Sequence, residues 1–326
     1  MKLSNLLRRA GTALLALAFV ALGHAQDYPS RPIKIIVPYA AGGQGDSSIR
    51  IIANALSQQL GQTFVVENIP GSSGIGAIQT VMRAPADGYT LMYNDNGHWG
   101  INPALYKKLP YDTLRDLAPV GLIAQSTLFL VATASFPANN LKDLIAAVKA
   151  KPDFYTYASS GIGSPHHLTM EEFKSALGLK ILHVPYKGSS QSIPALVSGE
   201  VSMAIASLPA VQGFVKEGKL KLIAGNSKNR SVFAPSVPAM REAGIADFDQ
   251  SAGIGIFAPA GTPKPIIAKL SAALAKAVAL PDTVNRFAVV GLEPATNTSP
   301  EFLTQTVIAD QAKFAQIVKI SGAQAE

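Results

Sequence analysis

Two glycine-containing turns carry the residues with the clearest potential for binding chemistry. The first, residues 40–46 (Ala-Ala-Gly-Gly-Gln-Gly-Asp), lies between an apolar run and a helical pattern, as does the second, residues 157–165 (Tyr-Ala-Ser-Ser-Gly-Ile-Gly-Ser-Pro). A helix N-terminus carries unpaired backbone N–H groups and partial positive charge, and glycine lets that backbone approach a ligand closely. Such turns can hold an anion without a cationic side chain. Two of them, in separate halves of the chain, predict a clamp for a small carboxylate.

The residues around the first turn divide into candidates for ligand contact and candidates for support. Gly42 and Gly43 are expected to offer N–H groups to a carboxylate, directly or through water, although glycines here could serve only to make the turn. Asp46 would repel an anion and is expected to brace the glycine loop. Tyr39 either covers the ligand as an aromatic wall or fills the core. A further helix N-terminus, residues 72–74, is expected on the same rim.

The second turn raises the same choice between contact and support. Ser164 is a good N-cap residue, and His167 is expected to be a packed, hydrogen-bonded support for the loop. Lys187 either supplies a countercharge or reaches solvent. Ser207 and Leu208 end a strand and are expected to face the cleft. The expected ligand-binding residues are Tyr39, Ala41, Gly42, Gly43, Asp46, Ser72, Ser73, Gly74, Asn94, Ser159, Gly161, Ser164, His167, Lys187, Ser207 and Leu208.

The elements that position these turns follow from alternating strand and helix patterns. Apolar runs at residues 33–37, 64–68 and 89–93 each lead into a glycine-rich or polar loop, and a helical pattern runs to residue 60, where Gly61 stops it. Such β–α alternation means a parallel sheet with helices on both faces, which binds ligands at the carboxyl ends of its strands. Further strands are expected at residues 128–132, 182–186, 201–207 and 254–258, and further helices at residues 141–151, 165–177 and 301–320.

The first 25 residues are expected to be a signal peptide. Lys2, Arg8 and Arg9 form a basic segment, residues 10–22 are an apolar run too short to span a bilayer comfortably, and small residues favour cleavage before Gln26. A membrane anchor is the alternative. Because no second long apolar segment follows, we expect a soluble, exported product. Removing three of the 28 Lys+Arg leaves 25 against 21 Asp+Glu, so the net charge falls from +7 to +4 and favours anionic ligands only weakly.

Other functional classes find little support in the sequence. The chain has no cysteine, which excludes disulfides, thiol catalysis and thiolate metal sites. The glycines of residues 71–76 have the wrong order for a dinucleotide fingerprint, and no Gly-Lys-Ser/Thr follows a glycine loop. His166 and His167 are adjacent, unlike metal ligands at i and i+4, and no carboxylate pair indicates acid–base catalysis. No basic cluster interleaved with aromatics indicates nucleic-acid binding. We expect no catalytic residue, metal or cofactor.

Several short motifs follow one another in a recognisable order. They are Val37-Pro38-Tyr39 with Gly42-Gly43 and Asp46, then residues 102–106 with 109–112, 161–168, 183–188 (His-Val-Pro-Tyr-Lys-Gly) and 258–263. In this order they resemble the solute-binding proteins of tripartite tricarboxylate transporters, often called the Bug family. The resemblance implies an α/β, two-lobed periplasmic-binding-protein fold of type II, in which each lobe is a mixed sheet flanked by helices and the cleft lies between lobes. It also favours Tyr39 as a wall over the ligand.

The resemblance further implies a mode of action and a division of the chain. It implies a periplasmic protein, expected to be a monomer, that captures a dicarboxylate or aromatic acid by hinge closure and delivers it to a membrane permease. Lobe 1 would comprise residues 26–128 and 252–326, and lobe 2 residues 129–251. A ligand-sensing partner of a periplasmic signalling receptor is the alternative function, and an exported α/β enzyme is less favoured.

Departures from the family pattern bear on the identity of the ligand. Ala40-Ala41 stand where the family usually has proline, Ser202 where it often has aspartate, and Ala252 where it often has tryptophan. The bulky pair His98-Trp99 also occupies a loop that is commonly small in the family. Trp99 would either contact a ring-bearing ligand or cover the surface.

Overall fold

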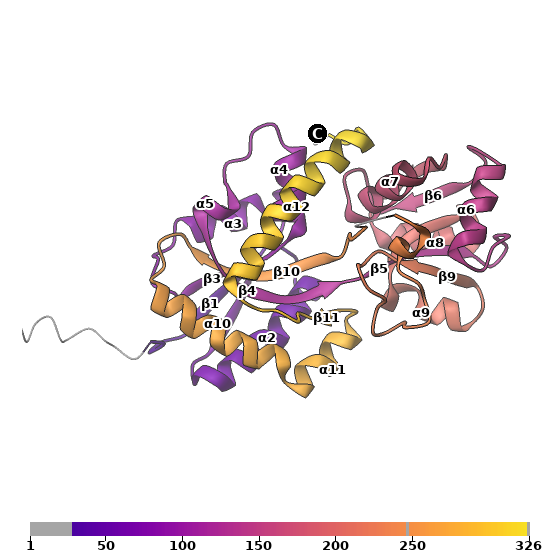
Figure 1. The fold of residues 1–326 in the computed structure, drawn as a ribbon. Coiled ribbons are helices and arrows are strands. Elements are labelled where there is room, and N and C mark those ends of the chain that lie inside the picture. The colour runs from indigo at the N-terminus through magenta and orange to yellow at the C-terminus, as the bar shows by residue number, and fades with distance from the viewer. Residues whose placement is uncertain (1–27, 246–247, 325–326) are drawn as a thin grey trace, which may run out of the picture.

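The computed structural model describes residues 28–245 and 248–324 of the 326-residue chain. The expected signal peptide and its cleavage site lie outside these residues. Within them, no helix is both long and apolar enough to cross a membrane. The described chain forms two lobes that lie side by side, each built on its own sheet (Figure 1).

The sheet of lobe 1 is mixed. The first three strands run parallel, whereas the strand that returns from lobe 2 pairs antiparallel with its neighbours on both sides. The spatial order is β11-β4-β10-β3-β1-β2. These strands are β1 (Ile33–Val37), β2 (Phe64–Asn68), β3 (Thr90–Asp95), β4 (Leu117–Ser126), β10 (Ala252–Pro259) and β11 (Glu293–Pro294).

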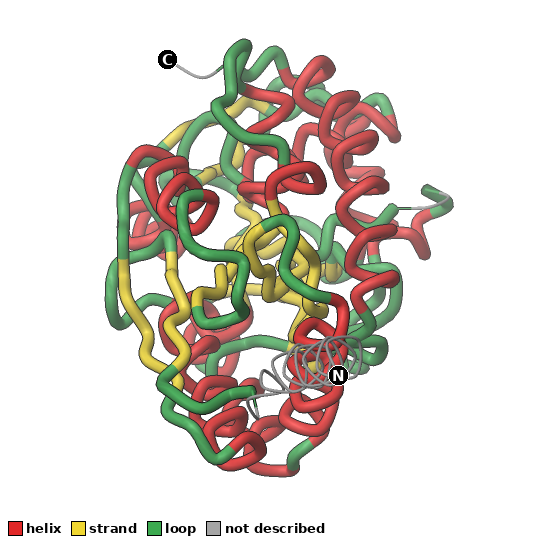
Figure 2. The backbone as a smooth tube through the Cα atoms, turned by 90° about the vertical axis from the view of Figure 1, so that its left-hand side faces the viewer, coloured by secondary structure: helices red, strands yellow, loops and turns green. Residues whose placement is uncertain are grey.

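Helices cover both faces of this sheet, and the view at right angles in Figure 2 shows them outside the strands. Because strand side chains alternate between faces, Ile35 packs with Ile49 on one side, and Ile36 packs with Ile78 on the other. The helical elements of lobe 1 are α2 (Gln44–Leu60), η1 (Ser72–Gly74), α3 (Ile75–Met82), η2 (Gly97–Ile101), α4 (Asn102–Leu105), α5 (Thr113–Asp116), α10 (Lys264–Ala279), α11 (Pro281–Val289) and α12 (Pro300–Ser321).

Lobe 2 repeats this plan on a smaller scale, with the spatial order β7-β6-β8-β5-β9. Strands β7, β6 and β8 run parallel, and β5 pairs antiparallel with β8 and β9. The elements of lobe 2 are β5 (Leu128–Thr133), α6 (Leu141–Ala150), β6 (Thr156–Ser159), α7 (Pro165–Leu177), β7 (Leu182–Pro185), α8 (Ser189–Ser198), β8 (Met203–Ser207), α9 (Leu208–Lys216), β9 (Leu220–Gly225) and η3 (Met240–Ala243).

The mixed sheets confirm the fold implied by the resemblance and correct the parallel sheet expected from alternation alone. The alternation holds for the strands that are followed by helices. The antiparallel strands β5 and β10 enter a lobe from the other lobe, so no crossover helix sets their direction. The two-residue β11 also pairs antiparallel, with β4 at the edge of the lobe-1 sheet. The expectation also lacked β4, β9 and α11. In β4, Pro119 and Gly121 interrupt the strand pattern.

The lobes are joined where the chain crosses between the sheets. Only Thr127 separates β4 from β5, and residues 226–251 connect β9 to β10. The buried Asn226 ties the two crossings together: its N–H donates to the Leu128 carbonyl (2.8 Å), its Oδ1 accepts from the Leu128 N–H (2.8 Å), and its Nδ2 donates to the Gln250 carbonyl (2.9 Å). The expected division into residues 26–128, 129–251 and 252–326 stays a prediction. Its boundaries fall near the two crossings, at Thr127 and at residues 226–251.

The C-terminal helix also links the lobes. In Figure 1, α12 runs from lobe 1 towards α7 of lobe 2. Phe314 and Ile317 of α12 share a buried apolar cluster with Leu168 of α7 and Ile101 of η2. Lys313 of α12 donates to the Asp249 carbonyl in the crossing segment (2.9 Å). The lobes therefore meet through covalent crossings and through a packed helix.

Candidate functional site

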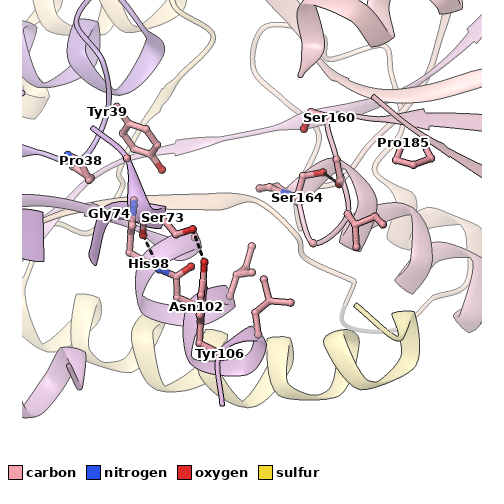
Figure 3. Close-up of a pocket in the computed structure, with 18 of the residues that line it drawn as sticks. Pro38, Tyr39, Ser73, Gly74, His98, Asn102, Tyr106, Ser160, Ser164 and Pro185 are labelled. Carbon is pink, nitrogen blue, oxygen red and sulfur yellow. Dashed lines mark hydrogen bonds between the residues drawn. The ribbon is translucent and has the colours of Figure 1, made fainter. Parts of the chain in front are cut away.

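Two adjoining cavities lie between the lobes at the carboxyl ends of the parallel strands. The larger, about 730 Å³, is here called the Ser73 cavity, and the smaller, about 620 Å³, the Asp95 cavity. Tyr39, Gly97 and Pro165 line both. Figure 3 shows the walls of the Ser73 cavity, with Tyr39 on the lobe-1 side and Ser160 and Ser164 on the lobe-2 side. Their size suits a small-molecule ligand.

Asp46 holds the first glycine turn in place. Its carboxylate accepts hydrogen bonds from the Gly42 N–H (2.9 Å), from Arg50 Nε (2.9 Å) and from Asn68 Nδ2 (2.9 Å). Burial raises the pKa of Asp46, but these bonds outweigh burial and leave that pKa below its ordinary value. Asp46 therefore braces the loop, as expected. The Gly42 N–H is already bonded to Asp46, and its expected contact with a ligand stays a prediction.

The backbone N–H groups that remain free to bind a ligand lie further along the turn, at the start of α2. The N–H groups of Gln44, Gly45 and Asp46 have no acceptor in the described part of the chain, since a helix leaves its first N–H groups unpaired. Gln44 and Gly45 line the Asp95 cavity together with Gly43. Gly45 must be glycine because a Cβ there would lie 2.7 Å from Tyr39 Cδ2. The sequence pattern does not single out Gln44 and Gly45, although both stand inside the turn motif.

Tyr39, Asp95 and His98 form the polar wall of lobe 1. The Tyr39 hydroxyl donates to Asp95 Oδ2 (2.6 Å), and the Gly97 N–H donates to Asp95 Oδ1 (3.0 Å). His98 Nδ1 lies 2.9 Å from Oδ1, close but not well aligned for a hydrogen bond. Burial raises the pKa of Asp95, yet the nearby His98 ring and these donors outweigh burial and lower that pKa. Burial and the neighbouring Asp95 carboxylate raise the pKa of the Tyr39 hydroxyl. The wall thus presents an ionised, partly buried carboxylate.

The third turn contributes to the Ser73 cavity. Ser73 Oγ lies 2.7 Å from the Tyr106 hydroxyl, and Asn102 Nδ2 donates to the Ser73 carbonyl (2.8 Å). Gly74 packs so closely on the His98 ring that a Cβ there would lie 2.4 Å from it. Asn102 and Tyr106 were absent from the expected site, although both belong to a motif that carries the family resemblance.

Imidazoles hold the turn of lobe 2. The Gly163 N–H donates to His167 Nδ1 (3.1 Å), Ser159 Oγ lies 2.7 Å from His183 Nε2, and Ser160 Oγ lies 2.7 Å from His166 Nδ1. The rings of His167 and His183 stack with centroids 4.3 Å apart. Burial lowers the pKa of all three histidines, to about 4 for His166 and for His183. His167 is buried, as its supporting role predicted.

The N-cap of α7 completes this turn. Ser164 Oγ accepts from the His167 N–H (3.2 Å) and donates to the Gly161 carbonyl (2.6 Å), while Pro165 begins the helix. His166 and Pro165 line the Asp95 cavity, as do Gln44 and Gly45 at the N-terminus of α2. Two helix N-termini, one from each lobe, therefore open on the same cavity. We had not assigned His166 to the site, since only its adjacency to His167 had been considered.

Sequence comparison identifies the family. The pattern described as "Tripartite tricarboxylate transporter family receptor" matches residues 48–322. The chain belongs to this family. Among curated relatives, a UPF0065 protein of Bordetella pertussis is 38% identical over 90% of each chain. Protein BugT of the same organism is 33% identical over 99% of each chain, which confirms the resemblance to the Bug family.

Solved structures of the receptor family share the fold. The periplasmic binding protein BugD is 33% identical with a TM-score of 0.72, and the match covers 92% of this chain and all of that one. Rpa4515 of Rhodopseudomonas palustris, solved with adipate, is 32% identical with a TM-score of 0.75 over 91% and 99% of the two chains. MatC (Rpa3494) of the same species, solved with malate, is 31% identical with a TM-score of 0.71 over 89% and 100%. Family and fold are those of periplasmic solute-binding proteins, not of enzymes.

The receptor fold brings about half of the expected site residues to the cavities. Asn94 is fully buried and lines neither cavity, because its side chain alternates with that of Asp95 to the other face of β3. Ser207 precedes α9 at its N-cap, and Leu208 lines a separate groove beside Pro209. The expected residues that line a cavity are Tyr39, Ala41, Gly43, Ser73, Gly74, Gly161, Ser164 and Lys187, and those that line neither are Gly42, Asp46, Ser72, Asn94, Ser159, His167, Ser207 and Leu208.

Trp99 plays neither of the roles considered for it. Its ring is fully buried, packs against Phe257 of β10 with centroids 5.8 Å apart, and lines neither cavity. Its Nε1 donates to Asp310 Oδ2 of α12 (2.8 Å). Trp99 is therefore a core residue that ties η2 to α12.

Proposed function

We propose that this receptor captures a small carboxylate in the Asp95 and Ser73 cavities, closes its lobes over the ligand and delivers it to the permease of a tripartite transporter. The observation that carries the proposal is the pair of helix N-termini, α2 and α7, which open on one cavity from opposite lobes. The unpaired N–H groups of Gln44 and Gly45 in α2 favour an anion. At α7, Pro165 has no N–H and the His167 N–H is bonded to Ser164, so this helix contributes mainly the partial positive charge of its N-terminus. The adipate and malate in the structures of two relatives are carboxylates as well.

The hydrogen bonds that such a site can form are strong enough for micromolar binding of a carboxylate. A hydrogen bond to a charged group contributes about 1.5–3 kcal/mol, and several of them, offset by ordering and desolvation, are consistent with micromolar binding at about −8 kcal/mol. Because both lobes must supply donors to reach this binding free energy, the lobes are expected to close when the ligand binds. The crossings held by Asn226 are the expected hinge.

A ligand screen tests the binding proposal. The exported chain, residues 26–326, would be unfolded thermally with a panel of dicarboxylates, hydroxy acids, amino acids and aromatic acids, and each hit titrated by calorimetry. A ligand at a hundredfold excess over its Kd stabilises the fold by about 2.7 kcal/mol, which raises the Tm measurably. If no acid raises the Tm of protein that was refolded to remove bound ligand, carboxylate capture is wrong.

Closure, delivery and oligomeric state need separate measurements. Small-angle scattering with and without the ligand should show a smaller radius of gyration on binding and a mass of one chain. An unchanged radius would contradict hinge closure, and a doubled mass would contradict the expected monomer. Uptake by the reconstituted permease should require the ligand-loaded receptor, and uptake without it would contradict delivery.

A further inference from the structure

The Asp95 cavity contains one formal charge that works against a second carboxylate. Among its lining residues only Asp95 carries an ionised side chain, and that side chain is 13% exposed. Two possible cations lie near it, and both line the other cavity: the His98 ring, 2.9 Å from Asp95 Oδ1, and Lys187, at an exposed rim where water and salt weaken its effect. A dicarboxylate in the Asp95 cavity would bring one anionic end towards a buried anion.

The hydrogen bonds of Asp95 leave room for one more donor. An ionised carboxylate has about four lone-pair sites. Within the described residues, Oδ1 is approached by the Gly97 N–H and by His98 Nδ1, whereas the only hydrogen bond to Oδ2 comes from the Tyr39 hydroxyl. The open position on Oδ2 is an acceptor, so a ligand N–H or O–H can occupy it and a second carboxylate cannot.

The rest of the Asp95 cavity supplies hydrogen-bond donors and apolar side chains. The N–H groups of Gln44 and Gly45 and the N-terminus of α7 favour the carboxylate end of a ligand. Leu128 and Ile254 add apolar side chains to the lining of the same cavity. One cavity therefore offers donors for a carboxylate and an acceptor for a different group.

We infer that Asp95 is a specificity-determining residue that selects carboxylates carrying a hydrogen-bond donor, an ammonium or a hydroxyl, over acids whose second group is another carboxylate. The inference rests on the proposed function and narrows its substrate class to amino acids and hydroxy acids. A charge-assisted hydrogen bond to Asp95 should favour the donor-bearing ligand, while like-charge repulsion disfavours the dicarboxylate of equal length.

The test compares ligands that differ only in one terminal group. Calorimetry would measure ω-aminohexanoate, ω-hydroxyhexanoate and adipate, and the corresponding ω-aminobutyrate, ω-hydroxybutyrate and succinate. Wild type should bind the better donor-bearing member of a set about tenfold to a hundredfold more tightly than its dicarboxylate, the ratio expected for one hydrogen bond to a charged group. Comparison of the ω-amino acid with the ω-hydroxy acid in each set shows which donor Asp95 prefers.

Two variants show whether Asp95 causes the preference. Asp95→Asn removes the charge with little change of shape, and should reduce the ratio to about twofold or reverse it. Asp310→Asn is the matched control, because Asp310 is also a buried carboxylate that accepts a hydrogen bond, but it lines neither cavity. It should leave the ratio unchanged. If Asp95→Asn does not fold, tighter binding of the dicarboxylates by wild type would still overturn the inference.

The outcomes separate this inference from the proposed function. Tighter binding of the dicarboxylates by wild type, or an unchanged ratio in folded Asp95→Asn, overturns the role of Asp95 and leaves carboxylate capture standing. The role of Asp95 is also overturned, and carboxylate capture again stands, if an acid without a hydrogen-bond donor binds while none of the six ligands does. Failure of every acid in the wider screen overturns both.

Discussion

In lobe 1 a carboxylate holds the glycine turn, whereas in lobe 2 imidazoles hold it. Asp46 accepts the Gly42 N–H in the first turn, and His167 accepts the Gly163 N–H in the second. Each acceptor sits in the first turn of the helix that follows, α2 or α7. The same backbone problem, an N–H that would otherwise stay unpaired, is solved by an anion on one side and by a neutral ring on the other.

Each lobe balances support of its turn against ligand binding in a different way. An anion near a helix N-terminus is favourable to the helix but competes with an anionic ligand, and Arg50 partly offsets the charge of Asp46. A neutral imidazole adds no negative charge, so the turn of lobe 2 stays open to a carboxylate. Its weakness is protonation, since an imidazolium nitrogen can no longer accept a hydrogen bond.

The largest expected effect follows from filling the lobe-1 turn. Gly43→Leu should weaken ligand binding more than a hundredfold, about 3 kcal/mol, and leave the Tm of the free protein nearly unchanged. A Cβ at Gly43 meets only the Ala40 carbonyl at 3.5 Å, so the turn tolerates it, while the longer side chain enters the Asp95 cavity. Calorimetry and thermal unfolding measure the two quantities. Gly213→Leu, on the exposed surface of α9, is the control, and unchanged affinity in Gly43→Leu would contradict the lobe-1 site.

Acid should disturb lobe 2 before lobe 1. Burial lowers the pKa of His166 and His183 to about 4, with Lys174 opposing and Glu171 favouring protonation of His183. An unfolded chain takes up these protons near pH 6.5, so the stability present above pH 6.5 is lost as the pH falls towards 4. The pKa of Asp46 lies below 3.8, so its brace survives this range. We expect a loss of about 2–3 kcal/mol after allowance for screening by water.

Urea unfolding at a series of pH values measures this loss. A variant with His166→Gln and His183→Gln should show a flatter curve between pH 6.5 and pH 4.5, because amides do not titrate there. Equal slopes for wild type and variant would show that other groups, and not the imidazoles of lobe 2, govern the acid response.

Removal of the carboxylate brace should have a smaller effect. Asp46→Ala should lower the free energy of unfolding by about 2 kcal/mol, because the Gly42 N–H and Asn68 Nδ2 lose their acceptor. Asp46→Asn keeps one acceptor oxygen, so its loss in urea unfolding should be smaller. Equal losses in the two variants would mean that the charge of Asp46, and not its hydrogen bonds, supports the turn.

Local rules explain what the sequence predicted well. Gly61 ends α2 in the left-handed region at φ 67°, and Ser164 caps α7 with Pro165 as its first residue. Each of these features depends on residues within a few positions of one another. The bracing role of Asp46 was also predictable, since an acidic residue in the first turn favours the helix.

Features that depend on distant partners could not be predicted. Trp99 is a core residue because Asp310, 211 positions away, accepts its N–H. The sequence shows that side chains alternate along the strand containing Asn94 and Asp95, but not which of its faces meets the cleft. Placing Ser207 correctly would have required knowledge of how α9 turns away from the cavities.

The smallest expected effect tests the imidazole brace itself. His167→Phe keeps a ring to stack on His183 but removes Nδ1, so the buried Gly163 N–H loses its acceptor. We expect a loss of about 1 kcal/mol in urea unfolding at pH 7, and weaker ligand binding because the turn is less well held. His167→Gln, which offers an acceptor oxygen, should recover part of both. If His167→Phe matches wild type in stability and affinity, lobe 2 needs no acceptor at this position, and the contrast between an anionic and a neutral brace would fail on the lobe-2 side.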